Sequence, residues 1–150
     1  DYAGWAREAA DSVRFAGRLE HDEVAALLPA TDAMVVPSTF PEAFGMVAAE
    51  AAAAGVLPVC AGHSGLAEVS RTLGRALPAQ AAGLLAFPVD DRAVEAIAER
   101  LVAWLALPAA ERRSIGARLS ASVAANWSWQ EVAGRVLAGA AGELDDLPAP

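Results

Sequence analysis

The sequence predicts an α/β protein with a Rossmann-like, doubly wound parallel sheet, and three observations lead to that class. Short apolar runs of the length of buried strands alternate with helical patterns through the first 90 residues. Such alternation requires crossover connections, which give a parallel sheet covered on both faces. After Phe87 the patterns are helical alone, and a chain of 150 residues suits one domain with a single core.

Four strands are expected, and six helices. The strands are predicted at residues 12–16, 33–36, 56–61 and 84–87. The helices are predicted at residues 22–28, 44–54, 66–73, 94–105, 109–125 and 129–141. Ser128 and Glu131 form a capping box at the start of the last helix, with Trp127 and Val132 placed as a hydrophobic staple.

Four strands are fewer than the ~5 to 6 usual for such a sheet. We therefore expect residues 1–142 to be part of a Rossmann-like domain that is truncated on its N-terminal side. Residues 143–150 are expected to form an acidic, Pro-ending tail.

Composition and charge exclude several classes of function. A net charge of −8 repels polyphosphate backbones, so nucleic acid is not an expected partner. No stretch reaches the ~18 to 20 apolar residues of a membrane span, and the first residues show no secretory signal. Cys60 is the one cysteine and is expected to be a reduced, buried thiol. His21 and His63 lack metal-type spacing, so no metal site is expected, and we expect a cytoplasmic protein.

The stretch STFPEAFGMVAAEAAAAG, residues 38–55, carries the candidate site. It follows a predicted strand at its carboxyl end, which is where open α/β sheets bind ligands. Gly45, placed in the first turn of the expected helix, would let a ligand approach the N–H groups of Ala43, Phe44 and Gly45. Helix N-termini of this kind favour an anion such as phosphate.

Glu42 and Glu50 are the two charged residues of this stretch. Glu42 precedes the expected helix, and Glu50 lies about one and a half turns into it. A carboxylate on a helix that is otherwise apolar needs a partner. The pattern by itself leaves a second interpretation open, in which Glu42 complements the helix dipole and Glu50 is a surface residue.

The ten residues EAFGMVAAEA, 42–51, resemble the E-x7-E motif of retaining, family 4-type glycosyltransferases with the GT-B architecture. In that family the motif usually reads E-G-F-G at its start, and Ala43 replaces the first glycine here. Further matching segments lie on both sides of this motif, in the family's order, at residues 15–17, 30–32, 36–38, 55–56 and 65–68. The resemblance runs from about residue 13 to residue 129.

This resemblance implies that residues 1–142 are part of a nucleotide-sugar-binding domain, and it implies a role for each candidate residue. Glu50 would accept hydrogen bonds from the ribose of a nucleotide-sugar donor, and Glu42, the expected catalytic residue, would contact the donor sugar. The amides of residues 43–45 would face sugar hydroxyls or the diphosphate. The loop at Gly17 and Arg18 would lie near the base, although Arg18 could instead be an exposed residue that pairs with Glu20.

His63 and Ser64 stand where the family often has a pair of glycines. They would either touch the donor or make a turn.

The resemblance also implies a function for the whole protein. It would transfer a sugar from a nucleotide diphosphate sugar to an acceptor, with retention and without a metal ion or other cofactor. The family's G-R-x4-K-G segment, which clamps the diphosphate, and the acceptor-binding N-terminal domain would lie upstream of this chain. The isolated chain is therefore expected to be inactive, with a last helix that packs toward the missing domain. Through that domain the protein could be peripheral to a membrane, and without it an uncovered sheet edge favours self-association.

Two other classes stay open from the residues. The chain could belong to another GT-B enzyme, such as a nucleotide-sugar epimerase or a phosphorylase. It could also be a non-catalytic α/β interaction module, in which both glutamates are structural and no nucleotide binds.

Overall fold

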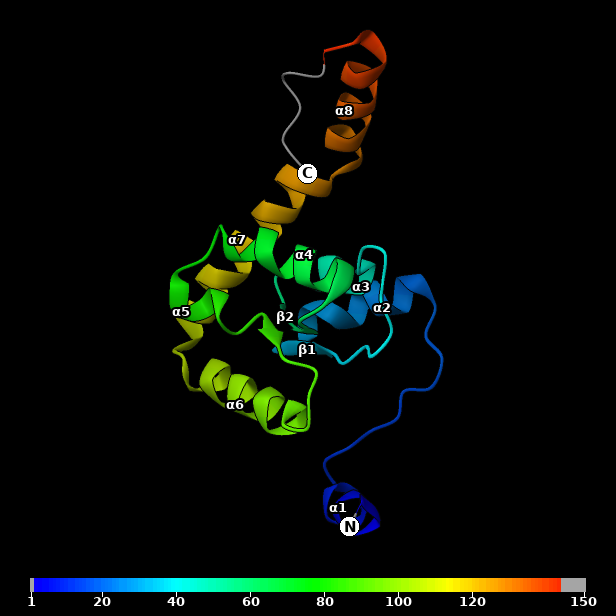
Figure 1. The fold of residues 1–150 in the computed structure, drawn as a ribbon. Coiled ribbons are helices and arrows are strands. Elements are labelled where there is room, and N and C mark those ends of the chain that lie inside the picture. The colour runs from blue at the N-terminus through cyan, green and yellow to red at the C-terminus, as the bar shows by residue number, and fades with distance from the viewer. Residues whose placement is uncertain (1, 144–150) are drawn as a thin grey trace.

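The computed structural model describes residues 2–143, so the expected tail at 143–150 lies almost wholly outside the described residues. It contains an open sheet of three parallel strands in the order β1-β2-β3 (Figure 1). The strands are β1 Ala33–Val36, β2 Leu57–Ala61 and β3 Ala86–Phe87. Val35 lies opposite Val59, and Cys60 opposite Ala86, in the parallel register. The predicted fold class is confirmed.

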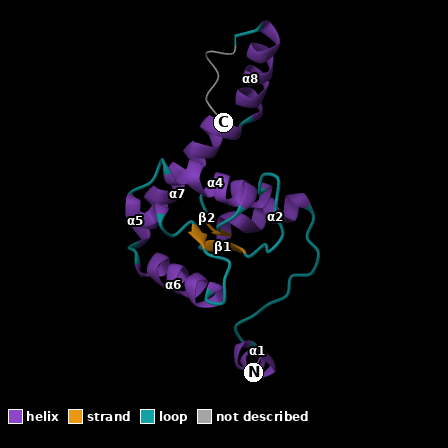
Figure 2. Ribbon diagram, in the orientation of Figure 1, coloured by secondary structure: helices purple, strands orange, loops and turns teal. Residues whose placement is uncertain are grey.

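Helices cover both faces of this sheet (Figures 1 and 2). Those described are α1 Tyr2–Ala9, α2 His21–Leu27, α3 Met46–Ala53, α4 Ser64–Gly74, α5 Ala79–Ala82, α6 Ala93–Ala106, α7 Ala109–Trp127 and α8 Trp129–Ala141, with a 3-10 turn, η1, at Leu28–Ala30. Helices α3 and α4 lie on one side of the strands and α6 lies on the other (Figure 1). Helix α7 packs against α3 and α4. Helix α1, which the sequence patterns did not predict, lies apart from the sheet in Figure 1.

The strand expected at residues 12–16 is wrong. This segment is irregular, and the Phe15 side chain is 95% exposed. A strand needs a neighbour to receive its backbone hydrogen bonds and a surface to pack on, and no described strand pairs with this segment. Its β-branched and aromatic composition is therefore not enough to form a strand here.

The core surrounds the central strand and is dense on the α3 side. All five residues of β2 are buried. Ala48, Ala51 and Ala52 of α3 are fully buried, because their small side chains let the helix lie close to the sheet and to α7. The alanine-rich composition of this helix thus reflects close packing.

Helix α6 is anchored across the opposite face by its side chains. Trp104 is 2% exposed, and its Nε1–H donates to the carbonyl oxygen of Asp32 at 2.8 Å, just before β1. Arg100 Nε donates to the carbonyl oxygen of Ala86 in β3 at 2.6 Å. Side chains of α6 therefore hydrogen-bond both to β3 and to the residue that precedes β1.

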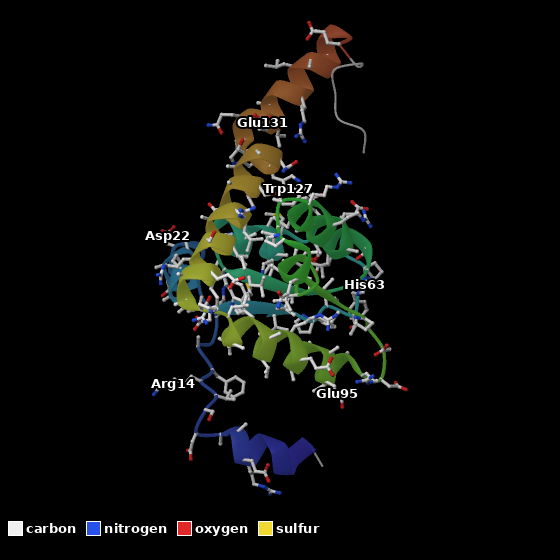
Figure 3. The ribbon with its side chains drawn as sticks, turned by 90° about the vertical axis from the view of Figure 1, so that its left-hand side faces the viewer. Arg14, Asp22, His63, Glu95, Trp127 and Glu131 are labelled. Carbon is white, nitrogen blue, oxygen red and sulfur yellow. The ribbon has the colours of Figure 1, made fainter. Side chains whose placement is uncertain are left out.

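Helix α8 begins at Trp129, as predicted, with Ser128 as its N-cap. The Ser128 Oγ accepts a hydrogen bond from the Glu131 N–H at 3.2 Å, which is one half of the expected capping box. Trp127 is half-buried against the core, whereas Trp129 is 85% exposed on the helix that extends from the body of the domain (Figure 3).

Candidate functional site

Two turns at the carboxyl edge of the sheet are joined through the backbone of Glu42. The first turn follows β1 and contains Glu42; the second follows β2 and leads into α4. The Glu42 N–H donates to Ser64 Oγ at 3.0 Å, and the Gly65 N–H donates to the Glu42 carbonyl oxygen at 2.9 Å. Both backbone polar groups of Glu42 are therefore held by the first residues of α4.

The His63 side chain makes a second connection between these turns, and Figure 3 labels it near the start of α4. Its Nε2 lies 2.8 Å from the carbonyl oxygen of Ser38, and its Nδ1 lies 3.1 Å from Ser64 Oγ. A carbonyl oxygen only accepts, so Nε2 is the donor in the first contact. His63 and Ser64 thus both have contacts within the turn; their contact with a donor stays a prediction.

Two glycines permit this close approach. A Cβ on Gly65 would lie 2.6 Å from both Cα and N of Phe44, so a side chain there would push the Glu42 turn away. Gly45 has a φ of +92°, and a Cβ on it would lie 2.7 Å from Leu66 Cδ2. Each glycine is explained by the packing of the two turns.

The expected position of Gly45 within the first helical turn is wrong. Helix α3 begins at Met46, because the left-handed backbone of Gly45 precedes the helix as its N-cap. The N–H groups of Ala43, Phe44 and Gly45 therefore lie in the turn, and none donates to an acceptor among the described residues. Ala43 and Phe44 are exposed, so water or a ligand can reach this part of the turn, whereas Gly45 is buried.

Glu50 lies half-buried in α3 and lines a cleft of about 450 Å³ beside α2. Arg18, which precedes α2, lines the same cleft, as do the apolar side chains of Leu19, Val24 and Met34. A neighbouring cleft of about 380 Å³ also has Glu50 in its wall. The structure thus brings Arg18 and Glu50 together, whereas Glu42 does not line the larger cleft.

The turn before α2 has the geometry that its residues indicate. Gly17 has a φ of +72° with open space around it, so glycine serves the backbone conformation there. Arg18 Nε lies 3.2 Å from Glu20 Oε1, and both side chains are exposed. The pairing considered for Arg18 is confirmed, and it coexists with the position of Arg18 at the cleft.

Cys60 lies near this edge of the sheet but is not a nucleophile. Burial raises the pKa of its thiol to about 11; a hydrogen bond with Ser70 lowers it slightly, and the Glu42 carboxylate adds a further rise. The thiolate is the reactive form, so Cys60 is inert at neutral pH. This agrees with the buried thiol that the sequence predicted.

Sequence reasoning missed one contact of the Glu42 turn. The Phe44 ring meets the Trp127 ring edge to face, with centroids 5.3 Å apart. Trp127 is the last residue of α7 (Figure 3), so the turn also contacts the end of that helix. No local pattern signals a contact between residues so far apart in the sequence.

The described part of the chain contains neither a metal-type cluster of side chains nor a membrane-spanning helix. Within residues 2–143, no group of three or more His, Cys, Asp or Glu side chains is placed to hold a metal ion. None of the described helices is both long and apolar enough to span a bilayer.

The open parallel sheet, with helices on both faces (Figure 1), a glutamate-bearing turn at its carboxyl edge and a second glutamate in a cleft, places the protein in the class of Rossmann-like α/β domains. Residues 4–118 match the model of the family described as glycosyl transferases group 1, and the chain belongs to that family.

Curated relatives agree with this family. Glycogen synthase from Mycobacterium tuberculosis (strain H37Rv) is 38% identical over 128 residues, which cover 81% of this chain and 27% of that protein. A GDP-mannose-dependent monoacylated alpha-(1-6)-phosphatidylinositol monomannoside mannosyltransferase from Corynebacterium glutamicum is 34% identical over 131 residues, covering 83% and 31%. The chain spans less than a third of the length of these relatives. No solved structure matches it significantly.

Proposed function

We propose that this chain is the donor-binding part of a glycosyltransferase. The intact protein would transfer a sugar from a nucleotide diphosphate sugar to an acceptor, with retention of configuration, in the cytoplasm. Membership of the group 1 family supports sugar transfer. A relative named as GDP-mannose-dependent supports a nucleotide-sugar donor.

The observation that carries the proposal is the position of Glu50. Glu50 is a half-buried carboxylate in a cleft whose wall combines apolar side chains with Arg18, Glu20 and His21, and it forms no ion pair with a described residue. Such a carboxylate favours a polar partner. Two vicinal hydroxyls of a ribose suit the two acceptor oxygens of a carboxylate. The base would then lie beside Arg18 and the apolar side chains of the cleft.

Glu42 and the amides that follow it would hold the other end of the donor. The three N–H groups of residues 43–45 point to no acceptor among the described residues, and such groups bind phosphate or hydroxyl oxygens well. Glu42 precedes them in the same turn, where its carboxylate would contact the donor sugar as the catalytic residue. No metal ion or other cofactor takes part in this proposal.

The isolated chain is proposed to be inactive. The diphosphate needs cations, but Arg18, the arginine at the cleft, pairs with Glu20. The G-R-x4-K-G segment that the resemblance implies does not occur in these 150 residues. Each missing charge-assisted hydrogen bond would lower the binding free energy by about 1.5 to 3 kcal/mol. Activity is therefore to be measured on the full-length protein that carries this domain.

The test is saturation-transfer NMR on that full-length protein with UDP, GDP and ADP sugars. We expect ribose protons of one donor to respond, and Glu50→Ala to weaken that donor's binding roughly ten- to hundredfold because hydrogen bonds to a charged acceptor are lost. Glu95→Ala is the matched control, since Glu95 is an exposed carboxylate on α6, on the other side of the sheet (Figure 3).

Two results would contradict the proposal. An absence of ribose response in the wild-type protein would favour the non-catalytic interaction module. An equal loss in the Glu50 and Glu95 variants would show that Glu50 has no special role. Product analysis then separates transfer to an acceptor from epimerase or phosphorylase chemistry.

A further inference from the structure

We propose that His63 and Ser64 are positioning residues, which hold the Glu42 turn in place for the donor sugar without contacting the donor. The inference rests on the proposed function, in which Glu42 contacts that sugar. It is carried by a chain of hydrogen bonds that runs between the turns after β1 and β2.

The direction of each bond in this chain follows from its chemistry. The His63 Nε2–H donates to the carbonyl oxygen of Ser38 at 2.8 Å, because that oxygen can only accept. In the neutral ring, Nδ1 is then an acceptor, and the Ser64 hydroxyl donates to it at 3.1 Å. The same Ser64 oxygen accepts the Glu42 N–H at 3.0 Å. This series of hydrogen bonds therefore fixes the turn after β1 at two points, Ser38 and Glu42.

These bonds use the polar groups that a donor would need. Both ring nitrogens of His63 and the Ser64 O–H are already engaged within the protein. Among these groups, one lone pair of the Ser64 oxygen stays unused. A sugar hydroxyl could displace the chain only by leaving a half-buried imidazole or amide without its partner.

The backbone of Ser64 supports a role for its hydroxyl. Ser64 has a φ of 48° and is the one non-glycine residue of the described chain with a positive φ. A residue with a Cβ is strained in this region, which glycine enters freely. Glycine would thus serve the backbone better, and the hydroxyl explains why a serine fits the position.

Ser64→Gly in the full-length protein is the decisive variant. It removes the hydroxyl and relieves the backbone, so loss of folding is not a concern. We expect the affinity for the nucleoside diphosphate that the wild type binds to stay within about twofold, because the ribose end at Glu50 is untouched. The kcat/KM for the nucleotide sugar should fall about tenfold, mainly through kcat, as the Glu42 turn loses a hydrogen bond.

Ser70→Ala is the matched control. Ser70 lies on the same helix and is buried, but its hydroxyl donates to the Leu85 carbonyl oxygen, away from the turn. This variant should leave both the nucleotide affinity and kcat/KM unchanged. A fall in kcat/KM equal to that of Ser64→Gly would show that any lost hydroxyl on α4 has this effect.

NMR of the ¹⁵N-labelled protein gives a readout that does not depend on activity. In Ser64→Gly the Glu42 amide signal should shift, because its acceptor is gone. In the wild type the His63 ring nitrogens should show the Nε2–H form and should not shift when nucleotide sugar is added.

Four results would overturn the inference, and one of them overturns it without affecting the proposed function. A shift of the His63 ring on donor addition, or a parallel loss of nucleotide affinity and kcat/KM in Ser64→Gly, would show direct contact. Normal nucleotide binding with unchanged kcat/KM in Ser64→Gly would overturn this inference alone. If the wild type binds no nucleotide, the proposed function is wrong and this role is wrong with it.

Discussion

Cys60 lies near the carboxyl end of β2 with no exposed surface, and burial raises the pKa of its thiol from its ordinary value near 9 to about 11. The folded state therefore favours the protonated thiol. In the unfolded chain the thiol has its ordinary pKa near 9. Between pH 9 and 11 the thiol therefore ionises mainly in the unfolded state.

We expect the free energy of unfolding to fall by about 2 kcal/mol as the pH rises from 9 to 11. Below that range the thiol is protonated in both states and contributes no pH dependence. Within it, the unfolded thiol loses its proton while the folded one keeps it, which favours unfolding. Urea unfolding across this pH range measures the effect, and Cys60→Ala should flatten the curve. An identical slope in that variant would contradict the assignment.

At the scale of elements, α3 and α7 meet where two glycines lie side by side. Gly55 follows α3, and Gly116 lies in α7. A Cβ on Gly116 would lie 2.4 Å from the Gly55 carbonyl oxygen, which is closer than real Cβ atoms approach a backbone oxygen. The two helices can lie this close because Gly116 carries no side chain, whereas Gly55 is explained by its positive φ of +77°.

Gly116→Ala should destabilise the domain by about 1 to 3 kcal/mol, because the overlap with backbone outweighs the gain in helix propensity of about 1 kcal/mol. Gly134→Ala in α8 is the matched control, since a Cβ there meets nothing within 4 Å. That control should be neutral or stabilising. Urea midpoints of the two variants check the difference, and equal midpoints would show that α7 moves away at little cost.

Elements with their own periodicity or composition could be predicted from the sequence, and those that depend on distant partners could not. Strand β2 and the long helix α7 follow from local patterns and were predicted within a few residues. Residues 12–16 have a strand's composition but no neighbouring strand in the described chain. The start of α3 was placed too early, because the left-handed conformation of Gly45 depends on packing against Leu66.

In the candidate site, too, local features could be predicted and contacts between distant residues could not. The spacing of Glu42 and Glu50 is a local feature, and the resemblance assigned roles to both. The hydrogen bond from His63 to Ser38 joins residues 25 positions apart, so spacing gives no signal of it. Only the register of two parallel strands brings their turns together.

At the scale of the whole molecule, both outer strands of the sheet, β1 and β3, lack a second strand partner among the described residues, and β1 is the longer of the two. Strand β1 pairs with β2 alone within the described residues, and residues 12–16 leave its other edge uncovered. An edge of unpaired backbone groups is a template for pairing with another chain. The domain is thus expected to self-associate through β1 when it is studied by itself.

Sedimentation velocity over a range of concentrations tests this expectation. The sedimentation coefficient of the 150-residue chain should rise with concentration. In the full-length protein, where further strands would cover the edge, it should stay constant. A single monomeric species of the isolated chain at all concentrations would contradict the expectation.

The way Glu42 is held has a consequence for how this domain can evolve. Its N–H and carbonyl groups are bound to Ser64 and Gly65, while its side chain has no hydrogen bond or ion pair to a described residue. Structure is therefore carried by the main chain of this residue, and its side chain has no structural duty. Substitutions of the Glu42 side chain leave the turn intact, so selection can change what the turn recognises without endangering folding.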